Sequence, residues 1–196
     1  MDTEEKLALL GGAARYEIVG PGRERVRRPG VLGALCAGEG PAGGAGALLR
    51  VLQSSRCDYD CAYCPLRKSA GTPRAVLAPE ELANAVDGLW RRQRIDGLML
   101  SSAVDGSPDA AMARMLDTLE ILRTHHHYDG YVHLKVLPGA APAAIAEAAR
   151  LADRLSLNVE APGARYLQGL STGKDWERDI MRPLADLRAL DQEGAV

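Results

Sequence analysis

Residues 48–64 read LLRVLQSSRCDYDCAYC, an apolar run followed directly by three closely spaced cysteines. The apolar part predicts a buried strand, which we place at residues 48–54. Cys57, Cys61 and Cys64 then share one tight loop after that strand. In parallel α/β folds, functional side chains gather at the carboxyl ends of the strands. The segment therefore predicts a site of three thiols at such an edge.

Short apolar runs alternate with amphipathic helical stretches in the rest of the chain. The further predicted strands cover residues 97–102, 131–137 and 155–160. Pro79, Pro108 and Pro142 stand where the intervening helices would begin. Because this alternation is typical of parallel strands joined by crossover helices, we expect the α/β fold class.

The two ends of the chain are expected to differ from this pattern. Asp2 and Glu5 form a capping-box pattern before a short helix, which the glycine pair 11–12 would end. Residues 20–47 are rich in Gly, Ala and Arg and predict a long loop. A last helix is expected from about Asp175, with a kink or restart at Pro183. We therefore divide the chain into an N-terminal helix and Gly-rich loop region, residues 1–47, and a barrel core, residues 48–196.

Composition and cysteine usage narrow the class of protein. The 196 residues suit one domain, and a net charge of −2 argues against a generally basic nucleic-acid-binding protein. The first six residues are acidic where a secretory signal would be basic, and no run of about 18 apolar residues occurs. We expect a cytoplasmic protein without a membrane partner, whose reduced cysteines bind metal rather than form disulfides.

Two predicted strands alternate apolar and polar residues, whereas a strand covered on both faces would be apolar throughout. If helices cover the apolar side, the polar side chains point to the inner face of the sheet. These side chains are Tyr131, His133, Lys135, Ser156, Asn158 and Glu160. That face either lines a ligand-binding barrel interior, which we favour, or is the exposed face of an open sheet.

The cysteine spacing points to a metal site of one of two kinds. Three Cys ligands on a four-iron cluster leave one iron open to a small molecule, unlike the four-Cys clusters of electron-transfer proteins. A structural zinc site needs four ligands, and Cys36 or a distant His would have to complete it. The alternative to a catalytic cluster is a non-catalytic zinc or iron-sulfur binding module. A third hypothesis is a barrel enzyme that acts through inward carboxylates, independently of the cysteines.

The motif C-x3-C-x2-C after a first strand, with aromatic Tyr63 before its last cysteine, resembles the signature of the radical S-adenosylmethionine (SAM) enzymes. The resemblance implies a partial TIM-like (βα) barrel that holds a 4Fe-4S cluster and S-adenosyl-L-methionine. It also implies reductive cleavage of SAM to a 5′-deoxyadenosyl radical, with an electron from a donor such as flavodoxin or ferredoxin. Four βα units are predicted against the six that the resemblance implies. We therefore expect an incomplete barrel, from a fragment of a longer protein or a shortened homologue.

More of the chain is similar to one family within that superfamily, the DNA modification/repair radical SAM proteins. This resemblance implies a substrate in nucleic acid, although the helix-hairpin-helix region of that family does not occur in this sequence. The similar segments are residues 6–16, 48–64, 73–75, 79–82, 97–102, 130–139 and 152–160.

The resemblance also implies roles for individual residues. Cys57, Cys61 and Cys64 would bind the cluster and so form the catalytic centre, and Tyr63 would lie beside the adenine of SAM. Ser101 and Ser102 stand where radical SAM enzymes have a glycine-rich turn near the methionine amino group. Candidates for the SAM carboxylate, the ribose hydroxyls or the substrate are His133, Lys135, Asn158 and Glu160. Cys36 receives no ligand role.

Overall fold

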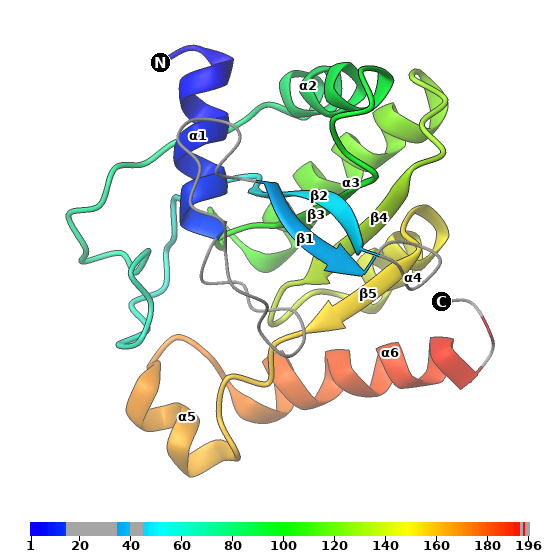
Figure 1. Ribbon diagram of the computed structural model, residues 1–196. Helices are drawn as coiled ribbons and strands as arrows, with labels where there is room; N and C mark the ends of the chain where they lie inside the picture. The colour runs from blue at the N-terminus through cyan, green and yellow to red at the C-terminus, as the bar shows by residue number, and fades with distance from the viewer. Residues whose placement is uncertain (15–34, 40–44, 193, 195–196) are drawn as a thin grey trace.

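Four parallel strands lie side by side in chain order (Figure 1). The computed structural model describes residues 1–14, 35–39, 45–192 and 194. A fifth strand is antiparallel to the first of the four. The carboxyl ends of β2 to β5 therefore meet at one edge of the sheet. In sheet order the strands are β1 (Leu35–Glu39), β2 (Ala45–Leu52), β3 (Gly97–Ser101), β4 (Tyr131–Val136) and β5 (Arg154–Leu157).

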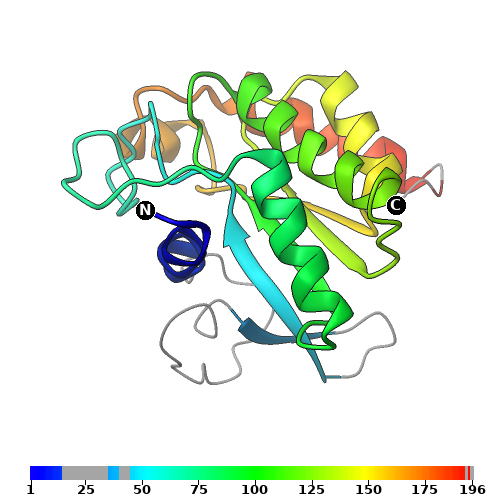
Figure 2. The ribbon, with the colours of Figure 1, turned by 90° about the horizontal axis from the view of Figure 1, so that it is seen from above.

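Three helices connect the parallel strands and cover one face of the sheet, as Figure 2 shows. Each begins with proline as predicted, because proline lacks the N–H that has no partner in the first turn. Apolar strand residues that face these helices are fully buried, among them Val51, Leu98 and Leu134. The predicted α/β class and the predicted apolar face are therefore confirmed. The helices are α2 (Pro79–Arg91), α3 (Pro108–Thr124) and α4 (Pro142–Leu151).

Helix α1 (Thr3–Ala13) lies beside β2. The predicted capping box is present, because the Asp2 carboxylate accepts from the Glu5 amide and the Glu5 carboxylate accepts from the Asp2 amide. The prediction that the glycine pair 11–12 ends the helix is wrong. The helix continues to Ala13 through the buried Gly11, although glycine in a helix costs about 1 kcal/mol.

The loop predicted over residues 20–47 is corrected in two places. Residues 35–39 form β1, and β2 begins at Ala45 rather than at residue 48. An edge strand pairs through its backbone and needs no apolar alternation, so the sequence carried no strand pattern there. The remainder of the predicted loop, residues 20–34 and 40–44, lies outside the described residues.

The chain after β4 departs most from expectation. β5 ends at Leu157 rather than at residue 160, and an unpredicted helix α5 (Ala164–Leu170) follows. Asp175 caps a π-helix, Trp176–Met181, and α6 (Arg182–Gln192) starts just before Pro183, as the predicted restart requires. No helix in the described part of the chain is long and apolar enough to cross a bilayer.

Candidate functional site

The loop that carries the three cysteines, residues 55–75, is called here the cysteine loop. It leaves the sheet after β2 and is fixed to the core on both sides. The Gln53 amide donates to the Ser101 carbonyl at 2.8 Å, and the Gln53 side chain donates to the Leu77 carbonyl at 2.7 Å. The Ser55 amide donates to the Ala75 carbonyl at 3.0 Å. The cysteine loop is therefore anchored by hydrogen bonds at the carboxyl end of β2, the position that the sequence predicted.

Arg74 organises the interior of the cysteine loop. Its guanidinium donates to four backbone carbonyls of the loop, at distances between 2.5 and 3.1 Å. A planar guanidinium presents five N–H donors in fixed directions, so one side chain can hold several segments of the loop together. Sequence reasoning missed this role, because nothing in the local pattern shows where an arginine side chain will turn. The four acceptors are Ser55, Leu66, Arg67 and Ala70.

The three cysteines of the loop are free thiols with different environments. Cys61 is buried, and its thiol donates to the Ser171 hydroxyl at 3.1 Å. Cys57 and Cys64 are half-buried, and the Cys64 sulfur accepts from the Leu66 amide at 3.4 Å. Burial raises the pKa of the Cys64 thiol, and the nearby Cys57 and Cys61 add to this rise.

A segment far along the chain, residues 160–181, packs against the cysteine loop and is called here the brace. Figure 2 shows its helix α5 beside the loop. The Ala62 amide donates to the Leu170 carbonyl at 2.8 Å. At Gly173 a Cβ would lie 2.9 Å from the Tyr59 ring, so the close approach requires glycine there. The sequence did not predict helix α5 of the brace, because so short a helix shows no extended apolar periodicity.

A buried aspartate fixes the far end of the brace. The Arg178 guanidinium donates to both carboxylate oxygens of Asp179, at 2.7 and 2.8 Å, and the Asp175 amide donates at 2.7 Å. Burial opposes ionisation of Asp179, but these hydrogen bonds outweigh it and hold its pKa below the usual value. The Asp179 carbonyl accepts from the Gly139 amide at 2.9 Å. The brace therefore joins the cysteine loop to the turn after β4.

Tyr63 and Glu160, both predicted site residues, meet at Lys174 of the brace. The Lys174 ammonium lies 3.1 Å from the Tyr63 hydroxyl and 3.2 Å from a Glu160 carboxylate oxygen. Desolvation raises the pKa of the Tyr63 phenol, and the Glu160 carboxylate raises it further. The structure thus brings together two side chains that the sequence assigned to separate elements.

The predicted polar face of the sheet is present on β4 and begins on β5. His133 and Lys135 are buried, and the His133 Nε2 lies 2.7 Å from the Ser156 hydroxyl. The strand register aligns Ser101, at the end of β3, with this face, and Ser101 and Ser102 are both buried. The Ser102 hydroxyl donates to the Ala103 carbonyl at 2.8 Å.

The strand orientation predicted for Asn158 and Glu160 is wrong. Because β5 ends at Leu157, both residues lie on the segment beyond the sheet edge, and Asn158 is exposed. The neighbouring Val159 is also exposed. Glu160 adopts a left-handed backbone conformation, with φ of 68°, which turns the chain away from the strand direction.

Comparisons with known proteins bear on the fold. No family model matches the sequence, and no curated protein matches it. Two solved structures of a hydrogenase maturase are similar. One is the FeFe-hydrogenase maturase HydG from Carboxydothermus hydrogenoformans, with a TM-score of 0.53 and 13% identity over 63% of this chain and 28% of that one. Another HydG structure gives a TM-score of 0.56 and 14% identity over 68% of this chain and 31% of that one.

The chain therefore spans less than a third of the HydG chains that it matches. The likeness confirms the expected α/β fold class, because the parallel sheet and its connecting helices are similar to part of the HydG structures. At this level of identity the comparison concerns the fold alone.

The donor set of the cysteine loop consists of three free thiols, the ligand type and number of a cluster that leaves one iron open. Among the described residues, no three Cys, His, Asp or Glu side chains converge on one point as the ligands of one ion do. In a cubane cluster each thiolate binds a different iron, so the thiols need only surround the cluster. The cysteine loop supplies three free thiols, with Cys61 shielded from solvent, and their placement around a cluster stays a prediction.

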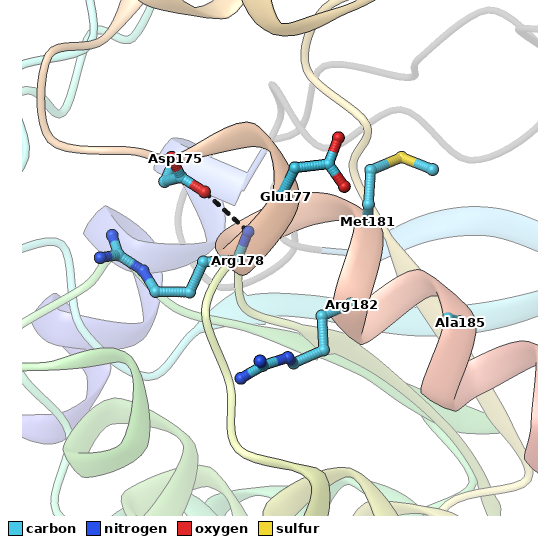
Figure 3. A pocket seen from close by; sticks show the side chains of 6 residues that line it. All are labelled: Asp175, Glu177, Arg178, Met181, Arg182 and Ala185. Atoms are coloured by element: carbon cyan, nitrogen blue, oxygen red, sulfur yellow. Dashed lines mark hydrogen bonds between the residues drawn. The ribbon is translucent and has the colours of Figure 1, made fainter.

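Two open pockets lie away from the cysteines. One, of about 570 Å³, is formed by the end of the brace and the start of α6, and the other, of about 370 Å³, lies between β5 and α6 and includes Ser156. Figure 3 shows Arg178 and Arg182 extending to the same side of the first pocket, while the Asp175 carboxylate accepts from the Arg178 amide. Since neither pocket is lined by a cysteine, the ligand-binding barrel interior stays a prediction.

His133 is expected to make folding pH-dependent. Burial, with the charges of Arg154 and Lys135, lowers the pKa of His133 to about 4. The unfolded chain therefore binds more protons than the folded chain between about pH 6.5 and 4. The free energy of unfolding is therefore unaffected by His133 above about pH 6.5. As the pH falls below this value, protonation of the unfolded chain lowers that free energy, by roughly 2–3 kcal/mol at pH 4.5.

Urea unfolding at pH 7 and pH 4.5 measures this loss, and ring NMR gives the His133 midpoint directly. His133→Gln should remove this part of the pH dependence, whereas replacement of the exposed His125 by Gln should leave it in place. A midpoint near 6.5 for His133 would contradict the prediction.

Proposed function

We propose that the chain is the core, or part of the core, of a radical SAM enzyme. One observation carries the proposal. Three free thiols share a loop, anchored at the carboxyl end of the first parallel strand, in a fold similar to part of HydG. A catalytic centre at the carboxyl ends of parallel strands is what this architecture favours.

Cys57, Cys61 and Cys64 would hold a 4Fe-4S cluster through three of its irons. When bound, the cluster and SAM would together supply reductive cleavage of the sulfonium bond and a radical that abstracts hydrogen from the substrate. Arg74 and the brace would keep the thiols in place, and burial of Cys61 would limit solvent access from that side.

The protein's polar side chains would bind and orient SAM. Tyr63 offers its ring to the adenine, and its hydroxyl is held by Lys174. His133, neutral because its pKa is low, can donate or accept a hydrogen bond at the inner face, and Lys135 can pair with a carboxylate. Ser101 and Ser102 mark the end of β3, and Asn158 and Glu160 lie just past β5.

Partner and substrate class follow from the sequence resemblance alone. A one-electron donor of the flavodoxin or ferredoxin type would reduce the cluster. The substrate would be nucleic acid, as in the DNA modification/repair radical SAM proteins. Both stay predictions.

The test is anaerobic reconstitution of the chain with iron and sulfide. In the presence of a chemical reductant, we expect a cluster signal in electron paramagnetic resonance (EPR) that changes when SAM is added, together with formation of 5′-deoxyadenosine. Stoichiometric bound zinc or iron, with no spectral change when SAM is added, would instead support the non-catalytic binding module. Activity that persists after all three cysteines are replaced would support the third hypothesis, a barrel enzyme that acts through inward carboxylates.

A further inference from the structure

Lys174 is nearly enclosed by the contact between the brace and the cysteine loop. Its side chain is 7% exposed, and the ammonium contacts both the Tyr63 hydroxyl and the Glu160 carboxylate. The same ammonium lies 5.8 Å from the centre of the Tyr63 ring. A buried ammonium is retained only where partners compensate its lost hydration, and here one partner comes from each of the two segments.

Glu160 supports this contact from the brace side. Its side chain is 13% exposed, and its backbone is in the left-handed region that residues other than glycine rarely adopt. Such a conformation persists where the surroundings hold it in place, and it concentrates at functional sites. The backbone at Glu160 turns the chain as it leaves β5, and its carboxylate pairs with Lys174.

Tyr63 transmits the contact to the cysteines. It lies inside a tight turn closed by a hydrogen bond from the Cys64 amide to the Cys61 carbonyl at 3.0 Å. Two further brace contacts act on the same turn, from Leu170 to Ala62 and from Ser171 to Cys61. A constraint on the Tyr63 side chain therefore also limits how far the turn can open.

We propose that Lys174 is a positioning residue, which ties Tyr63 to the brace and thereby holds the Cys61–Cys64 turn closed. Where the proposal concerns SAM binding, it rests on the function proposed above. Its effect on the turn does not, because the contacts exist in the chain without any cofactor. Lys174 would act through Tyr63 and touch neither cluster nor substrate.

The first test measures the turn in the reduced, metal-free protein. Alkylation of Cys61 by iodoacetamide, resolved by mass spectrometry, reports how often the buried thiol becomes accessible. Lys174→Met keeps most of the length of the side chain but removes its charge and its donors, and should raise the alkylation rate about tenfold. Lys174→Arg should keep the Cys61 alkylation rate within about twofold of the wild-type rate, because a guanidinium can also bridge a hydroxyl and a carboxylate.

Lys68→Met is the matched control. Lys68 is an exposed lysine of the cysteine loop, which also carries Cys61, and its ammonium lies 3.8 Å from the Asp58 carboxylate. This variant should leave Cys61 alkylation unchanged. If Lys174→Met does not fold, Tyr63→Phe tests the same contact, because it removes the hydroxyl and keeps the ring. An unchanged Cys61 rate in a folded Lys174→Met or Tyr63→Phe protein overturns the proposal.

The second test uses the reconstituted protein. Lys174→Met should leave the EPR spectrum of the cluster alone unchanged, while the SAM concentration for half of the SAM-induced change rises about tenfold. A purely structural role would not separate these readouts. If the wild-type chain shows no response to SAM, the proposed function fails, yet the alkylation experiment still decides whether Lys174 closes the turn.

Discussion

Replacement of Cys61 by alanine is expected to lower SAM cleavage by more than about 100-fold in the reconstituted protein. Loss of a residue that merely supports a metal ligand costs about 10–100-fold, so the loss of a direct ligand should exceed that range. Cys61 is also the thiol that is buried at the contact with the brace, where water cannot easily substitute for it. The 5′-deoxyadenosine formed per reconstituted chain, with iron counted in parallel, measures the effect.

The fourth cysteine provides the matched control. Cys36 lies outside the cysteine loop, so Cys36→Ala should keep both the cluster and the activity. The Cys61→Ala protein should stay folded, because removing one buried sulfur costs about 1–2 kcal/mol. A folded Cys61→Ala chain that cleaves SAM at the wild-type rate would refute the assignment of Cys61 as a ligand.

Elements whose determinants are local in the sequence could be predicted. The helices that start at Pro79, Pro108 and Pro142 were found because the fixed φ of proline and its missing N–H suit the first helical position. The parallel strands were found because their buried faces need apolar side chains. β1 and the true end of β5 were missed. β1 forms because its backbone pairs with β2, and β5 ends early because the chain turns at Glu160. Neither cause leaves a pattern in the local sequence.

In the candidate site, too, only the features that are local in the sequence could be predicted. The cysteine motif is contained within eight residues, so its pattern could be read directly from the sequence. The contact of Tyr63 with Lys174 spans 111 positions, and that of Cys61 with Ser171 spans 110. No periodicity links residues at such separations, because the path of the brace across the sheet edge brings them together. The residues that support the site were therefore invisible until the fold was known.

The largest structural effect in the loop is expected for Arg74→Met. This change removes the donors to four carbonyls that span the loop from Ser55 to Ala70. Water can solvate some of these carbonyls, so we expect a loss of roughly 3–5 kcal/mol in the free energy of loop opening rather than the full sum of four charged hydrogen bonds. Hydrogen exchange and Cys61 alkylation in the metal-free protein measure this opening.

Arg74→Lys tests whether the shape of the guanidinium, rather than its charge, holds the loop. A lysine ammonium is a single point with three donors and cannot reach four carbonyls spread around the loop, so Arg74→Lys should be nearly as damaging as Arg74→Met. Arg56→Met is the control, because Arg56 belongs to the same loop but is exposed. Since the three thiols need a fixed loop to surround a cluster, the two Arg74 variants should also retain less iron after reconstitution. Wild-type exchange rates in Arg74→Met would show that the brace alone suffices to hold the cysteines.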